Sequence, residues 1–134
     1  MTLSRLQLLV VVLLATTVCF AQTQATSERG KDLFRTNCVG CHSMTCNRNG
    51  PKLEGLFGRT AGSVPDFQHY TPALKASGIV WTDETLNAFL TDPNKLVPGT
   101  AMAGWGKIAN ANERKDLIAY LRSEDRAFEL CPKS

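Results

Sequence analysis

The chain has 134 residues, of which 43% are hydrophobic and 20% are charged, and its formal net charge is +3. This length fits one domain, and the share of charged residues is ordinary for a folded chain rather than a disordered one. With so small a net charge, no block of like charges and no internal repeat, we expect no binding to nucleic acid or to an anionic membrane surface.

The first 21 residues have the composition of a secretory signal peptide. Arg5 is the only charge in this stretch, and residues 6–20 are almost entirely apolar or small. Small residues at Cys19 and Ala21 supply a cleavage site, so we expect cleavage after Ala21 and a single mature domain over 22–134. That domain carries 14 Lys and Arg against 12 Asp and Glu, since only Arg5 is lost. An uncleaved anchor is the alternative, but the apolar run is shorter than the ~18 residues of a spanning helix.

Cys38, Cys41 and His42 form a Cys-x-x-Cys-His motif, which is typical of c-type haem attachment. In such a motif the two thiols add to the two vinyl groups of the porphyrin, and the adjacent imidazole becomes an axial ligand of the iron. A thioredoxin-like site would need a βαβ pattern, which the sequence does not show. A zinc site would need a second ligand pair, and Cys46 and His69 do not form one. The motif therefore predicts one covalent haem c.

The second axial ligand decides between an electron carrier and a catalyst, because an open iron position binds small molecules. Met44 lies two residues from His42 and cannot reach the opposite face of the haem. Met102 lies in a segment rich in Pro and Gly, 98–104, which indicates a loop. From the residues alone this Met is either a ligand or a packed apolar side chain, so both classes of protein stay open at this point.

Seven separated segments are typical of one family and occur in the family's order: Gly30–Phe34, Cys38–His42, Asn49–Arg59, Tyr70–Leu74, Gly78–Trp81, Pro98–Met102 and Glu113–Leu121. From about residue 28 to about residue 126 the chain resembles the class I cytochromes c, in the mitochondrial-type branch with its bacterial relatives. The resemblance implies an all-α fold of about four helices wrapped around one covalent haem. It also implies a monomeric single-electron carrier rather than an enzyme.

The resemblance assigns the axial ligands. It implies that Met102 is the second iron ligand, opposite His42. It further implies that the carbonyl of Pro51 accepts a hydrogen bond from the Nδ1–H of the imidazole, which fixes the ring and increases its basicity.

The resemblance also implies a set of partners for a buried haem propionate. Arg59, Tyr70 and Trp81 match positions that hydrogen-bond this carboxylate, whose burial would be costly without donors. Thr100 matches a position that closes the same polar network.

Several positions depart from the family pattern. Phe89 stands where a Tyr hydroxyl near the Met sulfur is usual, and we expect this loss to alter the reduction potential. Ala101 replaces a Lys beside the Met. Asn37 and Asn94 also occupy places that are often basic. We therefore expect a haem edge that is less positive than in mitochondrial proteins, with Trp105 in place of an aromatic that covers the Met side.

Two cysteines are extra to the family motif. In the family's architecture the loop after the haem motif lies near the end of the last helix, which implies a Cys46–Cys131 disulfide. The alternatives are two free thiols or an intermolecular bridge.

Helices are expected over about 28–36, over 72–77, after Thr82 and before Pro93, and from about Asn110 onward. In the last of these, an apolar stripe is formed by Leu117, Ile118, Leu121 and Phe128. The resemblance implies that the first and last helices cross near Gly30 and Tyr120.

The signal peptide and the haem motif together predict a periplasmic carrier with no stable membrane insertion after cleavage. Its candidate redox partners are a quinol-oxidising complex, a terminal oxidase or a periplasmic dehydrogenase. A haem catalyst and a non-haem exported Cys-x-x-Cys module are the competing hypotheses.

Overall fold

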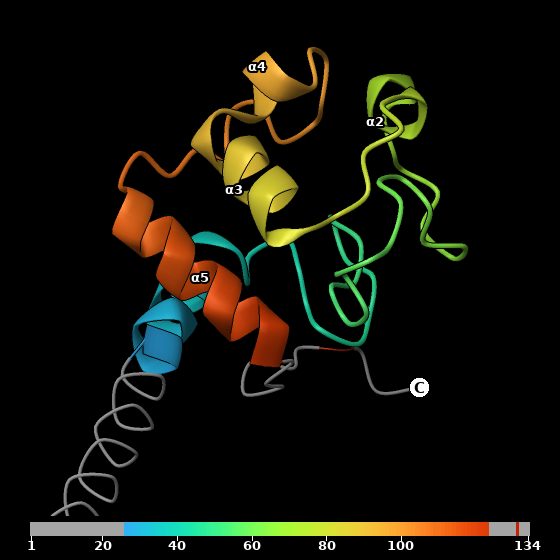
Figure 1. The fold of residues 1–134 in the computed structure, drawn as a ribbon. Coiled ribbons are helices and arrows are strands. Elements are labelled where there is room, and N and C mark those ends of the chain that lie inside the picture. Colours follow the sequence, from blue (N-terminus) through green and yellow to red (C-terminus); the bar gives the residue numbers. More distant parts are fainter. Residues whose placement is uncertain (1–25, 124–130, 132–134) are drawn as a thin grey trace, which may run out of the picture.

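The computed structural model describes residues 26–123 and Cys131, and its regular structure is helical (Figure 1). The expected signal peptide, 1–21, and Phe128 lie outside the described residues. Within the described ranges there is no strand, and the extended backbone pairs only at an isolated bridge between Thr60 and Val80, so the all-α class is confirmed. The helices are an N-terminal helix over 26–37, α2 (Pro72–Ala76), α3 (Asp83–Thr91), α4 (Pro93–Leu96) and α5 (Ala111–Ser123).

Helix α4 is an element that the sequence analysis did not predict. Pro93 was expected to end the preceding helix, and α3 does end at Thr91. Proline also suits the first turn of a new helix, because its missing N–H would have no partner there. Asp92 caps that turn by accepting a hydrogen bond from the Lys95 N–H at 3.1 Å. The proline that ends one helix therefore starts the next.

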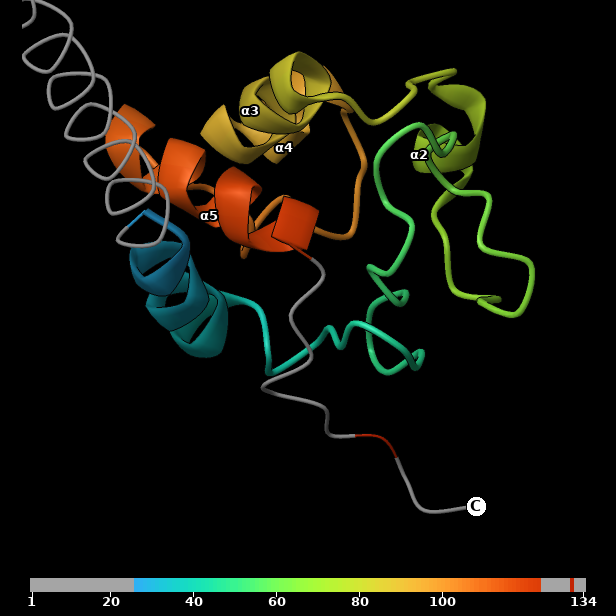
Figure 2. The ribbon, with the colours of Figure 1, turned by 60° about the horizontal axis from the view of Figure 1, so that its bottom comes forward.

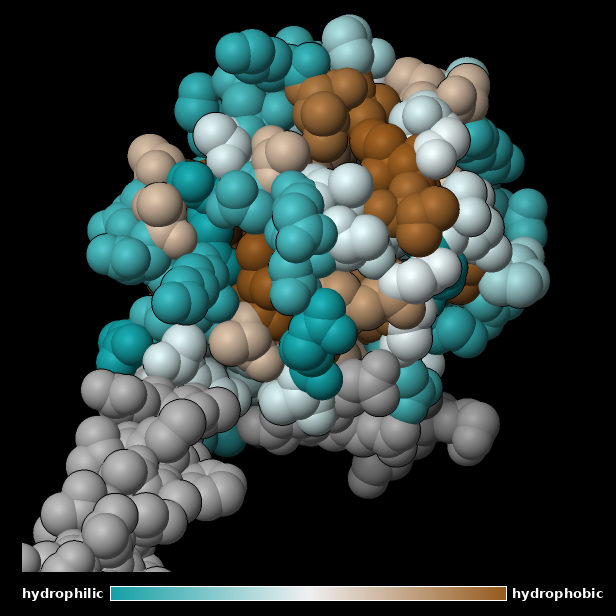
Figure 3. All heavy atoms as spheres, viewed as in Figure 1, coloured by the Kyte–Doolittle hydropathy of each residue, from teal (hydrophilic) through white to brown (hydrophobic). Residues whose placement is uncertain are grey.

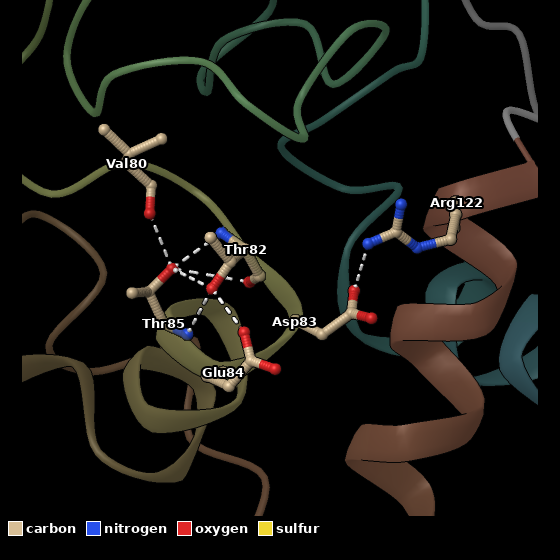
Figure 4. A network of polar contacts seen from close by, with 6 residues as sticks. All are labelled: Val80, Thr82, Asp83, Glu84, Thr85 and Arg122. Carbon is tan, nitrogen blue, oxygen red and sulfur yellow. Dashed lines mark hydrogen bonds and ion pairs between the residues drawn. The ribbon is translucent and has the colours of Figure 1, made fainter.

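The start of α3 is fixed by a reciprocal set of side-chain to main-chain bonds (Figure 4). The Thr82 hydroxyl accepts from the Thr85 N–H at 3.2 Å, and the Thr85 hydroxyl accepts from the Thr82 N–H at 2.7 Å. The same Thr85 hydroxyl donates to the Val80 carbonyl. Such a capping box satisfies N–H groups that a helix end leaves without partners. An ion pair of 2.6 Å between Asp83 and Arg122 then joins the start of α3 to the end of α5.

The N-terminal helix packs closely against α5, as expected (Figure 2). A Cβ atom at Gly30 would lie only 2.0 Å from the main-chain oxygen of Asp116, so the two backbones touch at this point. The rings of Phe34 and Tyr120 pack beside the crossing in a tilted arrangement, with centroids 5.4 Å apart. Arg29 donates to the Asp116 carboxylate at 2.7 Å and pairs a largely buried charge on α5. Burial therefore compensates the low helix propensity of glycine here.

Helices α3 and α5 lie side by side in both views of the chain (Figures 1 and 2). Each contributes buried apolar side chains on its inner face, chiefly Leu86, Phe89 and Leu90 from α3 and Leu117 and Leu121 from α5. These five side chains also line a cavity, so the two helices supply one wall of the site described next. In the described part of the chain, no helix combines the length and apolar character needed to span a membrane.

Candidate functional site

A largely apolar cavity is lined on one side by helices α3 and α5, and otherwise by the turn after the N-terminal helix, the loop over 49–71, helix α2 and the loop over 100–108. All nine residues that the sequence analysis assigned to cofactor binding line it: Cys38, Cys41, His42, Pro51, Arg59, Tyr70, Trp81, Thr100 and Met102. The first and last of them, Cys38 and Met102, are 64 positions apart in the sequence. The fold therefore collects the whole predicted set around one space.

The two motif cysteines and the histidine share a tight turn that continues the N-terminal helix. The Cys38 N–H donates to the Phe34 carbonyl at 2.9 Å, and the Cys41 and His42 N–H groups both donate to the Cys38 carbonyl, at 3.0 and 2.8 Å. Burial, followed by the nearby Cys41, raises the pKa of the Cys38 thiol to about 12. Cys38 faces the same cavity as the imidazole.

The His42 imidazole is buried and held in one tautomer. Its Nδ1 lies 2.8 Å from the Pro51 carbonyl oxygen, which can only accept, so Nδ1 carries the proton and Nε2 has a lone pair available. Burial lowers the pKa of His42, with the bond to Pro51 opposing that shift. The ring is thus neutral, which is the form that ligates a metal.

Gly50 lies against the His42 imidazole and restricts its position. No role for Gly50 was predicted from the sequence. A Cβ atom at this position would lie 2.4 Å from the imidazole Cε1, so no larger residue fits without displacing the ring. The Gly50 N–H also donates to the Cys41 carbonyl at 2.8 Å, which ties the following loop to the motif. The position of Gly50 directly before Pro51 is the sequence feature that could have predicted its role in the site.

Met102 sits in a loop whose turns are closed by its own backbone. The N–H groups of Trp105 and Gly106 both donate to the Met102 carbonyl at 3.1 Å. A Cβ at Gly106 would lie 2.6 Å from the Met102 methyl carbon, so the thioether packs directly on the Gly106 backbone. Met44, by contrast, is 3% exposed in the core and is not among the residues that line the cavity.

Arg59 brings a cation to the cavity wall and is anchored by main-chain acceptors. Its guanidinium donates to the Glu54 carbonyl at 2.8 Å and to the Lys52 carbonyl at 3.0 Å. Burial lowers the pKa of Arg59, and the interaction with Tyr70 opposes that change. Burial also raises the pKa of Tyr70, so the phenol stays protonated and able to donate.

The remaining predicted polar groups are held by packing. Trp81 is 7% exposed and stands edge-on to Phe89, with ring centroids 5.1 Å apart. Tyr70 makes a similar contact with Phe67 at 4.8 Å. Phe67 was not assigned to the site by the sequence analysis, since a single Phe in a loop carries no distinctive signal. These contacts hold the indole and the phenol in the cavity lining.

Trp105 differs from its expected place. It lines the cavity but is 82% exposed, so it does not bury Met102. The physical reason is that the backbone of Gly106, rather than the indole, fills the space against the thioether.

Cys46 and Cys131 are brought together at the edge of the loop that follows the haem motif. Their Cα atoms are 5.7 Å apart, in the middle of the range that disulfides span. The Thr45 hydroxyl lies 3.3 Å from the Cys131 sulfur. The geometry therefore permits the predicted bridge.

The donor set fits a c-type haem. Two thiols, one neutral imidazole and one thioether line the same apolar space, and Arg59 can face a carboxylate. A planar apolar ring with two acidic groups matches that chemistry.

Comparison with known proteins agrees with this reading. The family model described as Cytochrome c matches residues 27–125. Cytochrome c from Arabidopsis thaliana is 42% identical over 77% of this chain and 93% of its own length. Cytochrome c from Euglena viridis is 48% identical over 72% of this chain and 95% of its own length. Among solved structures, cytochrome cH from Methylobacterium extorquens superposes with a TM-score of 0.68 at 37% identity, covering 72% of this chain and 97% of that one.

The chain belongs to the cytochrome c family. It is an electron-transfer protein that carries one covalently attached haem c and acts with redox partners.

Proposed function

We propose that this cytochrome c is an exported carrier whose haem iron is ligated by His42 and Met102. The observation that carries the proposal is that these two side chains, sixty residues apart, line one cavity and each pack on a glycine backbone. Such packing holds each donor in a single arrangement, which favours permanent ligation over an open position.

The roles of the chain's own residues follow from their contacts. When bound, the haem supplies an iron that changes its oxidation state by one electron. Cys38 and Cys41 attach the group covalently, and the Pro51 carbonyl orients His42. The Met102 loop is already closed by its own hydrogen bonds, so the thioether needs little rearrangement between the two oxidation states.

Arg59, Tyr70, Trp81 and Thr100 are proposed to hold a buried propionate. Two N–H groups of Arg59 donate to main-chain carbonyls, which fix the guanidinium at the wall. A fixed cation offsets the cost of removing a carboxylate from water.

The proposed location is the periplasm. Support comes from the N-terminal sequence, with its single Arg5, apolar run and small residues before Gln22. The Cys46–Cys131 pair suits an oxidising compartment. The proposed electron partners are a quinol-oxidising complex, a terminal oxidase or a periplasmic dehydrogenase.

The test is optical spectroscopy of the full chain co-expressed with the c-type maturation machinery. We expect a c-type reduced spectrum and, in the oxidised protein, the absorption band of Met–iron ligation. Met102→Ala should abolish that band. Met44→Leu, which changes a buried Met outside the cavity lining, should keep it.

Two results would contradict the proposal. A five-coordinate, high-spin spectrum with fast carbon monoxide binding would instead favour a haem catalyst. N-terminal sequencing of the exported protein should begin at Gln22, and retention of Arg5 would indicate an uncleaved anchor.

A further inference from the structure

Trp105 is the most exposed large apolar side chain among the described residues. It is 82% exposed, whereas the other two, Val80 and Leu96, are 43% and 40% exposed. Of these three, Trp105 alone lines the haem cavity. Tryptophan is among the residue types enriched in the side chains that dominate protein interfaces.

The backbone presents this indole in a fixed way. The Trp105 N–H donates to the Met102 carbonyl at 3.1 Å, and the next residue, Gly106, is buried against the Met102 methyl. The chain on either side of the indole is therefore tied down. A side chain presented from a rigid loop loses less conformational entropy on binding than one presented from a mobile loop.

The exposed part of the cavity lining contains no acidic residue, lysine or arginine. We define the cavity rim as the exposed residues that line the cavity: Asn37, Cys41, Asn49, His69, Ala101 and Trp105. None of these is Lys, Arg, Asp or Glu, and residues 96–106 contain no charged side chain. The face seen in Figure 3 is mostly hydrophilic, with apolar side chains reaching the surface in patches.

Two lysines near the site are paired with carboxylates. Lys52 lies 3.2 Å from Asp66, and Lys107 lies 3.1 Å from Asp92. In each pair, the carboxylate offsets part of the positive electrostatic potential that the lysine would present to a redox partner. The rim therefore lacks the positive charge that would steer an acidic partner onto it.

We propose that Trp105 is the anchor through which this protein docks on its electron-transfer partner, and that the partner's docking face is apolar and uncharged rather than acidic. The inference deepens the proposed function, because it assumes that electrons enter and leave through the cavity rim. An apolar contact of this kind predicts transfer rates that change little with ionic strength, since screening acts on charges.

The test is voltammetry of the holoprotein on gold electrodes coated with two kinds of monolayer. A mixed methyl- and hydroxyl-terminated layer stands in for an apolar partner face, and a carboxylate-terminated layer stands in for an acidic one. On the apolar layer, we expect Trp105→Ala to lower the electron-transfer rate constant about tenfold or more, as for an interface anchor. Trp105→Phe should lose less, and Val80→Ala, an exposed residue outside the cavity lining, should match the unmodified protein.

Faster transfer on the carboxylate layer, with steep salt dependence and no effect of Trp105→Ala, would overturn the proposal. So would loss of the Met–iron band in Trp105→Ala, because the indole would then support the ligand. Failure of the proposed function is distinguishable, since the band would then be missing from the unmodified protein before any electrode measurement.

Discussion

At the scale of single residues, two glycines support the side chains that are proposed to ligate the iron. Gly50 lies against the His42 imidazole, and Gly106 lies against the Met102 methyl. In each case the backbone itself is the supporting surface, so the donor side chain can reach the cavity while resting on rigid atoms. Contacts outside the ligand set orient the ligands and tune the metal site.

Gly106→Ala tests this support directly. The added Cβ would lie 2.6 Å from the Met102 methyl carbon, and 3.1 Å from a Pro93 ring carbon that cannot yield easily. The thioether must therefore shift away from its place. We expect a weakened Met–iron band and a reduction potential shifted toward that of Met102→Ala.

The matched control is Gly104→Ala, in the same loop. A Cβ at Gly104 meets nothing within 4 Å, so this variant should keep the spectrum of the unmodified protein. Equal spectra for the two variants would show that Gly106 does not position the ligand.

At the scale of elements, the fold depends on where helices begin and on how closely two of them approach. Thr82 and Thr85 start α3 by reciprocal hydrogen bonds, and Asp92 caps the short α4 after it. The N-terminal helix meets α5 through Gly30, at a distance that only hydrogen in place of a side chain allows. The turn that carries the haem motif continues from this packed helix, so the crossing also positions Cys38.

A Gly30→Ala variant tests whether helix propensity or helix–helix packing has the larger effect on stability at this position. In an exposed helix interior this change would stabilise by ~1 kcal/mol. Here the new Cβ would lie 2.0 Å from the Asp116 carbonyl oxygen, a backbone atom that cannot rotate away. We expect a net loss of about 2 kcal/mol or more in the free energy of unfolding, from forced separation of the helices.

The measurement is urea unfolding of the holoprotein followed by circular dichroism. Lys115→Ala, an exposed change on α5, should leave the midpoint nearly unchanged. A more stable Gly30→Ala variant would mean that the helices do not touch at this point.

At the scale of the whole molecule, the apolar core and the haem cavity share their residues. Leu86, Leu90, Leu117 and Leu121 belong to the buried core and also line the cavity. Helices α3 and α5 therefore complete their packing only when the cavity is filled. In a chain this short, the bound group supplies much of the apolar contact area.

A haem-free chain should consequently lose most of its helix. We expect a Cys38→Ala/Cys41→Ala variant isolated without haem to show largely unfolded circular dichroism, because its cavity wall would face water. The control is a Cys46→Ala/Cys131→Ala variant, which removes as many cysteines but should keep haem and helix. Native-like helical content in the haem-free chain would contradict the prediction.

The predicted Cys46–Cys131 bridge acts on the unfolded chain. It would close a loop across a sequence separation of 85 residues, for which the chain-entropy model gives ~4 kcal/mol. Removing both cysteines should lower the free energy of unfolding by up to that amount. Peptide mapping without reductant should recover residues 46 and 131 in one linked fragment, and separate fragments would refute the bridge.

The sequence by itself determined the chemistry of the site and most of the helices. Cys38, Cys41 and His42 are adjacent, so their role follows from local spacing alone. Pro93 and Thr82 marked helix boundaries for equally local reasons. The resemblance to the class I cytochromes c then supplied the distant residues, such as Met102, that local spacing cannot reach.

Only the tertiary structure decided which groups support those ligands and which face the solvent. The roles of Gly50 and Gly106 depend on atoms brought beside them by the fold, and a glycine carries no side chain to signal such a contact. The exposure of Trp105 was likewise fixed by the loop packing of its neighbour. The order of residues along the chain determines which chemical groups are available, whereas contacts between residues that are distant in the sequence decide where each side chain points.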